Sequence, residues 1–517
     1  MRLVVVGDTL LDRDVAGTAD RVCPDAPALV LTERNTMDRP GGAGLAALLA
    51  AGRGHEVTLL TALADDAGGA RLSQLLHAAG ITVYPLPLPG ATPEKIRLRA
   101  GRHVLLRLDR GGAPTTPGQP SGEALAALAD AVAVLVSDYG RGVTAVPALR
   151  AALAQSAAPV VWDPHPRGSA AVPGARLVTP NEAEVAVLTR GIGAAASGGR
   201  RLAAATRAAQ DLRGNWRAGA VAVTLGADGA LLCHAGPTPL VVPAPVRADG
   251  DSCGAGDRFA ASAALALASG ALVSEAVEAA VAEAAEFVAA GGAAGLRPRA
   301  ASEFLPEGGA LLGDGREAAG REAAGALVAD VRARGGTVVA SGGCFDLLHA
   351  GHVATLEAAR RFGDCLVVCV NSDASVARIK GPERPLVPQA DRVRVLRALS
   401  CVDDVIVFDE STPDSVLSWL RPDIWVKGGD YGDGTTGRVD LPEAELVRRW
   451  GGQTVIVPYL AGRSTSGMIA AASRRNGNHH VPAGDGNHSA PAGNGNQHVP
   501  AGTGGSAPAG AGNQKGA

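Results

Sequence analysis

The sequence has 517 residues, of which 46% are hydrophobic and 19% are charged, and this composition is typical of an ordinary globular chain with two or three domains. The formal net charge of −3 gives no reason to expect a nucleic-acid or membrane partner, and no apolar run approaches the ~18 residues of a membrane span. Seven cysteines without CxxC spacing argue against a zinc site or a disulfide framework, so we expect a cytoplasmic protein.

Short apolar runs alternate with alanine-rich helical patterns along the chain. This alternation is typical of α/β domains with parallel sheets. The first series of expected strands comprises residues 3–6, 57–60, 132–136, 160–162 and 221–224. The second series comprises residues 338–340, 366–370, 405–407, 424–426 and 454–457. The pattern therefore predicts two doubly wound parallel-sheet domains.

Two segments differ in composition from these domains. Residues 301–334 contain clustered glycines and are expected to link the domains, with one helix over residues 317–333. Residues 476–517 begin with three copies of a nine-residue repeat, NGNHHVPAG in its first copy, and carry too few apolar residues to fold. Four histidines of the repeats could bind metal ions weakly, but nothing fixes a ligand geometry, so we expect a disordered tail. The expected domains are residues 1–300 and 335–475.

A glycine turn in the first domain carries candidate catalytic residues. Gly254, Ala255 and Gly256 precede Asp257 and a helix of small residues over 258–268. Backbone amides at such a turn can bind the γ-phosphate of a nucleotide, and Asp257 can accept the proton of an attacking hydroxyl. Taken alone, the turn could equally be a helix cap.

A second glycine turn, CFDLLHAGH, follows the expected strand at 338–340. It places His349 and His352 where a helix begins, and the small residues between them let a nucleotide approach closely. Two imidazoles at this spacing can donate to phosphate oxygens as charge develops between the α- and β-phosphates. A zinc site is less favoured because no third ligand has suitable spacing. If the pair stood alone, the two histidines could equally serve only to stabilise the turn.

Lysine is rare in this chain, with only four residues among 48 basic ones. Lysine is a compact point charge, so in an arginine-rich sequence a lysine marks a place that arginine could not fill. Lys380 and Lys427 lie in glycine-flanked segments after expected strands, which is where ligands bind in open parallel sheets. The set suits in-line attack on the α-phosphate of a nucleoside triphosphate.

Residues 337–474 resemble the HxGH-type nucleotidyltransferases, and within them the adenylyltransferase half of the bifunctional heptose kinase–adenylyltransferases. The resemblance rests on GGCFDLLHAGH (342–352), VNSD (370–373), IKG (379–381), RP (384–385), KGGDY (427–431) and STS (464–466). It implies that His349, His352, Lys380 and Lys427 act on the triphosphate. It also implies nucleotide contacts for Cys344, Phe345, Asp346, Ser464 and Thr465. Gly342 replaces the asparagine usual before the Gly-Cys-Phe-Asp run.

Residues 1–300 resemble the ribokinase-type (PfkB) sugar kinases, and within them the kinase half of the same bifunctional enzymes. The matching stretches are GDTLLDR (7–13), PDAP (24–27), RPGGA (39–43), KIR (95–97), RLD (107–109), SDYGRG (137–142), TPNEAE (179–184), TLGADG (224–229) and CGAGD (253–257). The resemblance implies that Asp257 is the base and that Gly254, Ala255 and Gly256 form the anion hole. It assigns the sugar to Asp8, Asp12, Gly41, Gly42, Lys95 and Arg97, and the nucleotide to Asn181, Glu184, Thr224, Gly226 and Gly229.

The kinase match departs from the usual pattern at three positions. Leu45 replaces an asparagine that contacts sugar, His165 replaces the lysine of Asp-Pro-Lys, and Cys253 replaces the threonine before the Gly-Ala-Gly-Asp turn. A polar sugar contact replaced by leucine weakens binding by about 1–3 kcal/mol if its partner is left unpaired.

The resemblance implies a bifunctional enzyme of ADP-heptose synthesis. We expect it to phosphorylate heptose 7-phosphate at O1 with ATP, and to transfer AMP from ATP to heptose 1-phosphate with release of pyrophosphate. Mg²⁺ would be carried by ATP with Glu184 nearby, and a homodimer is the expected assembly. Two alternatives stay open: the same architecture acting on another sugar phosphate or with CTP, and an active transferase beside a weak or non-catalytic kinase-like domain.

Overall fold

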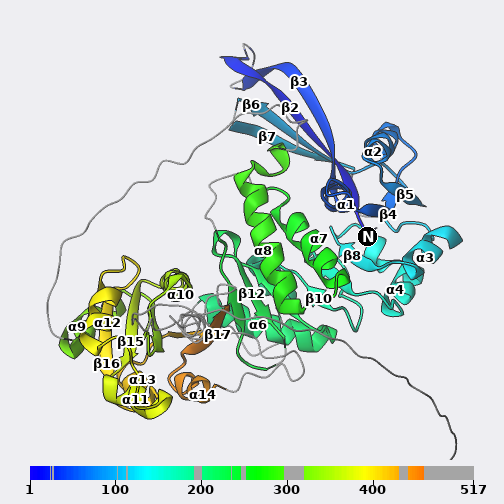
Figure 1. Ribbon diagram of the computed structural model, residues 1–517. Coiled ribbons are helices and arrows are strands. Elements are labelled where there is room, and N and C mark those ends of the chain that lie inside the picture. Colours follow the sequence, from blue (N-terminus) through cyan, green and yellow to red (C-terminus); the bar gives the residue numbers. More distant parts are fainter. Residues whose placement is uncertain are drawn as a thin grey trace, which may run out of the picture. The chain divides into compact units, whose positions relative to one another are not determined.

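The computed structural model (Figure 1) describes residues 1–23, 25, 28–101, 103–111, 115–190, 201–234, 236–245, 252–295, 320–429 and 441–458. The expected contacts of Ser464 and Thr465, and the tail at 476–517, lie outside these residues. Within the described residues, no helix is both long enough and apolar enough to cross a membrane.

A mixed sheet forms the body of the first domain. Its strands run in the order β13-β12-β11-β10-β9-β8-β1-β4-β5. All neighbours are parallel except the β11–β12 and β12–β13 pairs, which are antiparallel. The strands are β1 (Arg2–Gly7), β4 (Glu56–Leu63), β5 (Thr82–Pro87), β8 (Ala133–Ser137), β9 (Val160–Asp163), β10 (Leu177–Val178), β11 (Val221–Thr224), β12 (Ala230–Cys233) and β13 (Leu240–Val242).

Helices cover both faces of this sheet, which explains why β1 is a continuous apolar run. Leu3 and Val5 pack on one face with α1 (Ala43–Ala51), α7 (Ala255–Ala268) and α8 (Val273–Ala289). Val4 and Val6 pack on the other face with α3 (Gly122–Ala129), α4 (Pro147–Ala154), α5 (Glu182–Leu188) and α6 (Arg201–Trp216). Helix α2 (Ala67–Ala78) contributes Leu76 to the first face. A strand buried on both faces carries apolar residues at successive positions.

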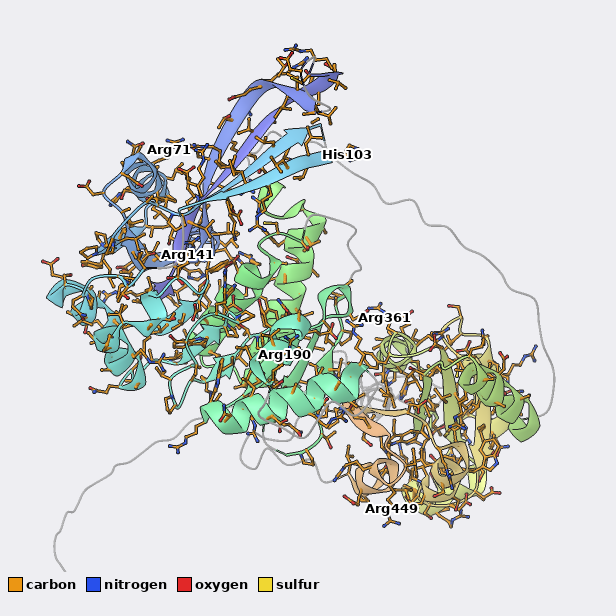
Figure 2. The ribbon with its side chains drawn as sticks, turned by 180° about the vertical axis from the view of Figure 1, so that it is seen from behind. Arg71, His103, Arg141, Arg190, Arg361 and Arg449 are labelled. Atoms are coloured by element: carbon orange, nitrogen blue, oxygen red, sulfur yellow. The ribbon has the colours of Figure 1, made fainter. Side chains whose placement is uncertain are left out.

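A separate four-stranded sheet rises from the first domain beside α7 and α8 (Figure 1), and we call it the lid sheet. Its order is β3-β2-β6-β7, and its strands are β2 (Thr9–Val22), β3 (Leu29–Gly42), β6 (Glu94–Ala100) and β7 (His103–Arg110). Figure 2 shows His103 near the tip of the β6–β7 hairpin and Arg141 near the base of the lid sheet. Several of the motifs matched to the sugar kinases lie on these strands, but the sequence pattern did not predict a second sheet.

The second domain has a fully parallel sheet in the order β16-β15-β14-β17-β18. Strand β18 also pairs with β13, through Ile456 and Leu240. The five strands are β14 (Val338–Gly343), β15 (Cys365–Asn371), β16 (Asp404–Phe408), β17 (Ile424–Gly429) and β18 (Gln453–Pro458). One face packs on α9 (Gly320–Ala333), α13 (Asp414–Leu420) and α14 (Pro442–Arg448), and the other on α10 (Ala350–Arg360) and α12 (Gln389–Arg397). Helix α11 (Asp373–Lys380) follows β15.

The expected strands all form, so the α/β fold class is confirmed. Helix α9 begins at Gly320 and buries Ala324, Val328 and Val331 in the core of the second domain. The latter part of the segment that we had assigned to the linker therefore packs with the sheet of the second domain. The helix after the first glycine turn begins at Ala255 rather than at residue 258.

Candidate active sites

The glycine turn of the first domain places Asp257 in the first turn of α7. Gly254 is the N-cap with a φ of 84°, a backbone conformation that favours glycine. The carboxylate of Asp257 is 5% exposed and accepts the hydroxyl hydrogen of Tyr139, with both oxygens 3.0 Å from the phenol oxygen. Burial raises the pKa of Asp257 to about 7, although the Tyr139 hydrogen bond and the charge of Lys95 lower it. A carboxylate with this pKa is matched to proton acceptance near neutral pH.

A cavity of about 330 Å³ lies at the N-terminal end of α7. It gathers five residues expected to bind nucleotide: Thr224, Gly226, Gly229, Ala255 and Gly256. Gly229 has a φ of 99°, and a Cβ there would lie 2.0 Å from the carbonyl oxygen of Val242, so only glycine fits. Side chains of α7 and α8, including Phe259 and Val281, supply an apolar wall suited to a nucleobase.

Three expected nucleotide residues, Asn181, Glu184 and Gly254, do not line this cavity. Asn181 caps α5 by accepting the Glu184 amide at 2.9 Å, and Glu184 returns the bond by accepting the Asn181 amide at 2.8 Å. Burial raises the pKa of Glu184. The pair forms a capping box, which is a sufficient structural reason for both residue types. In the anion-hole turn, the Ala255 amide donates to the Ser252 carbonyl at 3.0 Å.

The residues expected to hold the sugar lie at the base of the lid sheet. Asp8, at the end of β1, accepts the backbone amides of Tyr139, Arg141 and Val143 at 2.9–3.1 Å. Burial raises the pKa of Asp8. Asp8 therefore fixes the SDYGRG loop in addition to any sugar contact. A Cβ on Gly42 would lie 2.4 Å from the Asp8 carbonyl oxygen, so this glycine permits a close backbone approach.

Asp12 on β2 and Arg97 on β6 form an ion pair with 3.3 Å between Oδ1 and Nη1. A Cβ on Gly41 would lie 2.8 Å from Oδ2 of Asp12, so this glycine leaves room for the carboxylate. Lys95 lies two residues before Arg97 on β6, so both side chains are on the same face of the strand. Its ammonium is 5.3 Å from the centre of the Tyr139 ring. Burial lowers the pKa of Lys95. Of the sugar residues predicted from the sequence, Asp8, Gly42 and Lys95 thus lie next to Tyr139.

A second cavity of the first domain, of about 300 Å³, is lined in part by Tyr139, and we call it the basic cavity. Only Lys95 among its lining residues had been assigned to the site. Its other cations come from separate elements: Arg107 from β7, Arg141 from the loop after β8 and Arg167 from the loop after β9. His165, also in the loop after β9, lines the cavity as well, and burial together with the Arg167 charge lowers its pKa. Glu94 and Asp109 also line it. Sequence reasoning missed these cations because single arginines in different loops carry no spacing signal.

In the second domain, a cavity of about 230 Å³ gathers most of the predicted transferase residues. Its lining includes Cys344, Phe345, Asp346, His352, Lys380 and Lys427. His349 does not line the cavity, but its ring stacks on that of His352 with centroids 4.0 Å apart. The Nδ1 of His349 accepts the Gly351 amide at 3.1 Å, so His349 is also the N-cap of α10.

Burial, together with the charges of His349 and Lys380, lowers the pKa of His352 to about 4. The imidazole is therefore neutral at physiological pH. A neutral imidazole still has one N–H to donate. The helix N-terminus beneath it adds a positive dipole end, which favours phosphate at this position.

Asp346 has a structural task that the motif did not suggest. It is 2% exposed, accepts the Leu386 and Val387 amides at 2.6 and 3.0 Å, and pairs with Arg384. These hydrogen bonds and the Arg384 charge outweigh burial and lower its pKa. Asp346 therefore ties the CFDLLHAGH turn to the loop before α12.

Buried Arg392 ties the loops of this site together, and sequence reasoning did not single it out. Its guanidinium donates to the carbonyls of Cys344, Asn371 and Val387 at 2.5–3.0 Å and to the Asp373 carboxylate at 2.6 Å. The loops after β14 and β15 are thus joined to the loop before α12. In the sequence of α12, Arg392 is one of several arginines and looks like an ordinary surface residue. No sequence signal therefore showed that it is buried.

A neighbouring cavity of about 340 Å³ shares Gly342, Gly343, Cys344 and Lys427 with the first, and we call it the second transferase cavity. Its further lining includes Asn371, Ser411, Thr412, Asp414, Trp425 and Glu443. A Cβ on Gly342 would lie 2.4 Å from the Trp425 ring, so the usual asparagine does not fit this backbone as it stands.

The chain matches two family models and several curated relatives. Residues 1–299 match the pfkB family carbohydrate kinase model, and residues 340–449 match the cytidylyltransferase-like model. The bifunctional protein HldE of Streptomyces coelicolor is 57% identical over 471 residues, which cover 91% of this chain and 96% of the relative. The bifunctional protein HldE of Azorhizobium caulinodans is 37% identical, covering 91% and 98%.

The chain belongs to the HldE family of bifunctional proteins. Its first domain is a sugar kinase and its second a nucleotidyltransferase, as in the HldE relatives. The resemblance to bifunctional heptose kinase–adenylyltransferases is therefore confirmed, and with it the expected pair of reactions. A different substrate and a non-catalytic kinase-like domain find no support in these matches. Kinases and nucleotidyltransferases that use ATP generally need a divalent metal ion.

Within this HldE chain, the departure at Leu45 has a visible structural setting. Leu45 is 2% exposed and packs with Leu49 and Ala293, with Cys253 and Phe287 against them. A Cβ on Gly254 would lie 3.0 Å from its Cδ2. Leu45 thus supports the anion-hole turn through apolar packing, so the usual sugar contact is absent from this position.

Proposed function

We propose that the kinase centre binds heptose 7-phosphate with its phosphate in the basic cavity and its O1 hydroxyl at Asp257. One observation carries this proposal: Asp257 lies between two cavities of different chemistry. Its neighbour Gly256 lines the glycine-rich cavity, and its hydrogen-bond partner Tyr139 lines the basic cavity. The four cations of the basic cavity, Lys95, Arg107, Arg141 and Arg167, suit a phosphate that the substrate already carries.

In this arrangement Asp257 takes the proton of the O1 hydroxyl. The oxygen then forms a bond to the γ-phosphorus of ATP, and the bond from that phosphorus to the β–γ bridging oxygen breaks to release ADP. The positive end of α7 faces the developing charge. Lys95, on the sugar side, offsets charge on the transferred group. The chain's residues thus supply a proton acceptor, an orienting turn and cations.

The proposed phosphate site is tested with two substrates. Arg141→Ala and Arg167→Ala should each raise the KM for heptose 7-phosphate by about tenfold or more, because hydrogen bonds to charged groups are worth about 1.5–3 kcal/mol. The same variants should change the rate with heptose lacking the 7-phosphate by much less. Arg190→Ala, at an exposed arginine outside both kinase cavities (Figure 2), is the matched control. Equal losses with both substrates would contradict the assignment.

For the transferase, we place ATP in the cavity of His352 and heptose 1-phosphate in the second transferase cavity. The shared wall at Gly342–Cys344 and Lys427 supports this placement, because attacking and leaving groups must meet at one phosphorus. The phosphate of the sugar attacks the α-phosphorus of ATP and pyrophosphate leaves. A phosphate is already ionised, so this step needs no general base. His349, His352, Lys380 and Lys427 would stabilise the charge on the triphosphate.

We propose Mg²⁺ as the divalent ion and ATP as its carrier. Mg²⁺ keeps several waters and binds mainly phosphate oxygens with one or two carboxylates. The described residues contain no group of three metal-binding side chains. The half-buried carboxylate of Glu184 lies near the nucleotide strands through Asn181, which bridges to Thr224. These residues fit a metal that arrives with the nucleotide. Mg²⁺ would neutralise charge on the phosphates.

We further propose a homodimer formed through the lid sheet. Strand β7 is an edge strand with every residue exposed, and Leu106 and Leu108 share one face of it, with exposed fractions of 56% and 41%. An unpaired apolar edge is a ready partner for a second copy. Leu106→Glu with Leu108→Glu should give a monomer in analytical ultracentrifugation, whereas Val132→Glu, at an exposed apolar residue outside the lid sheet, should not. A wild-type monomer would contradict this assembly.

The location that we propose is the cytoplasm. None of the seven cysteines, all of which lie in the described residues, forms a disulfide. Free thiols are typical of a reducing compartment, which also supplies ATP.

A further inference from the structure

Tyr139 connects the two ends of the kinase site. Its phenol donates to both carboxylate oxygens of Asp257 at 3.0 Å, and its backbone amide donates to Asp8 at 3.1 Å. We propose that Tyr139 is a positioning residue of the kinase, whose hydroxyl aims the Asp257 carboxylate at the substrate hydroxyl and keeps it ionised. This inference rests on the proposed role of Asp257 as the base, and the SDYGRG motif alone did not assign a role to the tyrosine.

The backbone of Tyr139 is held from both sides. Asp8 accepts its amide and those of Arg141 and Val143, and the neighbouring Asp138 accepts the Gly140 amide at 2.7 Å. Both aspartates are buried, with 3% exposed. A loop fixed by two buried carboxylates holds the phenol in one place. The direction of the Asp257 carboxylate is therefore set before substrate binds.

The phenol has a single hydrogen, which it shares between the two oxygens of Asp257. A carboxylate has about four lone-pair positions, so it can accept a substrate hydroxyl while keeping the phenol. Burial and the nearby Asp257 charge raise the pKa of Tyr139 well above its ordinary value, so the phenol stays a donor throughout the working range. Tyr139 thus has no proton-transfer step of its own.

The charges around Asp257 decide the sign of the expected effect. Lys95 on β6 faces it as a cation and favours the ionised form. Asp12 on β2 and Asp163 on β9 face it as carboxyl groups, and the pKa of Asp163 is itself raised by burial and by Asp257. The Tyr139 hydrogen bond favours the ionised form, so its removal raises the pKa of Asp257 above its present value of about 7.

The test is Tyr139→Phe in the full chain, with kcat/KM for heptose 7-phosphate measured from pH 5.5 to 9.5. We expect the acid limb to move to higher pH, with activity about ten- to a hundredfold lower at pH 6 and within about threefold of wild type at pH 9. Circular dichroism melting curves report folding of the variant, and transferase activity of the same sample should be unchanged. Tyr84→Phe makes the same chemical change at a half-buried tyrosine on β5 and should leave the profile unchanged. An acid limb at its wild-type pH would overturn the inference.

A double-variant comparison gives a second, independent test. If Tyr139 acts through Asp257, Tyr139→Phe should cost nothing further in the Asp257→Asn background, because groups that act as a unit are not additive. A full additional loss would overturn the positioning role. Asp257→Asn alone tests the base: if that variant keeps wild-type activity, the base assignment itself fails. An inactive Asp257→Asn protein with an unchanged Tyr139→Phe profile refutes only the role of Tyr139.

Discussion

Lys427 and Glu443 form an ion pair at the wall shared by the two transferase cavities, with Nζ and Oε1 2.7 Å apart. Glu443 lies on α14 and is 7% exposed, whereas the Lys427 side chain is 29% exposed. The ammonium also lies 5.8 Å from the centre of the Trp425 ring. The lysine that the motif assigned to the triphosphate is thus held in place by a carboxylate that the motif did not include.

The ion pair predicts a separation of stability from activity. Glu443→Gln should lower the free energy of unfolding by about 1–2 kcal/mol, because it leaves a partly buried ammonium without its partner. Adding Lys427→Met should restore most of that stability. The double variant should still lose about 10²-fold in transferase kcat, because a preorganised cation is gone. Thermal unfolding and steady-state kinetics measure the two effects. A double variant that recovers activity would show that Lys427 serves structure alone.

Different substitutions at the two transferase histidines should distinguish a catalytic role from a helix-capping role. His352→Ala should lower kcat for AMP transfer by about 10²–10³-fold with a smaller change in KM, because preorganised donors act mainly in the transition state. His349→Asn keeps a side chain that can cap α10 but removes the imidazole. A normal transferase kcat in His349→Asn would make His349 a cap only. Circular dichroism melting curves of both variants are the control for folding, and kinase activity should stay at the wild-type level.

Asp257 predicts opposite effects on kinase activity and on stability. Its pKa of about 7 means that kinase kcat/KM should rise with pH through 7. Transferase kcat/KM should not change in that pH range through titration of His352, because the pKa of His352 is about 4.

Stability follows from the same raised pKa. The folded protein holds the Asp257 proton more tightly than the unfolded chain, so this group's contribution to stability is fully present below about pH 4 and is lost as pH rises through 7. The Tm advantage of Asp257→Asn over wild type should therefore grow from pH 4.5 to 7 and then level off. The loss is at most about 1.4 kcal/mol per pH unit. A constant Tm difference across that range would contradict the burial of an ionisable carboxyl.

Helix α9 predicts where the transferase domain begins. It buries Ala324, Val328 and Val331 against the transferase sheet. A fragment of residues 320–475 should therefore fold and transfer AMP, whereas one of residues 335–475 should be less stable by several kcal/mol, because it exposes the face that α9 covers. Circular dichroism melting curves of the two fragments measure this. Equal melting temperatures for the two fragments would show that α9 is part of the linker and does not stabilise the transferase domain. Residues 1–295 should keep the kinase activity alone.

The two central sheets could be predicted because buried parallel strands have a strong sequence signal. Runs such as Leu3–Val6 stand out when both faces are covered. The lid sheet could not be predicted, because a strand such as β7 is exposed on both faces and carries no consistent apolar alternation. Local pattern therefore identifies the core and misses a sheet whose stability comes from pairing.

The sites divide in the same way. Asp257, His349 and His352 could be predicted because their chemistry is concentrated in short glycine turns. Tyr139 lay within a matching stretch, but its contact with Asp257 joins residues 118 positions apart, and only the fold shows it. The basic cavity is built from loops after different strands. Residues that act together only after folding leave no spacing in the sequence.

The most direct test assays both reactions on one purified full-length protein and on its Asp257→Asn and His352→Ala variants, with products followed by ³¹P NMR. Wild type should convert ATP and heptose 7-phosphate to the 1,7-bisphosphate, and ATP and heptose 1-phosphate to ADP-heptose and pyrophosphate. Asp257→Asn should lose only the first reaction, and His352→Ala only the second. A folded variant that loses both reactions together, or a folded Asp257→Asn protein that still forms bisphosphate at the wild-type rate, would contradict two separate centres built on these residues.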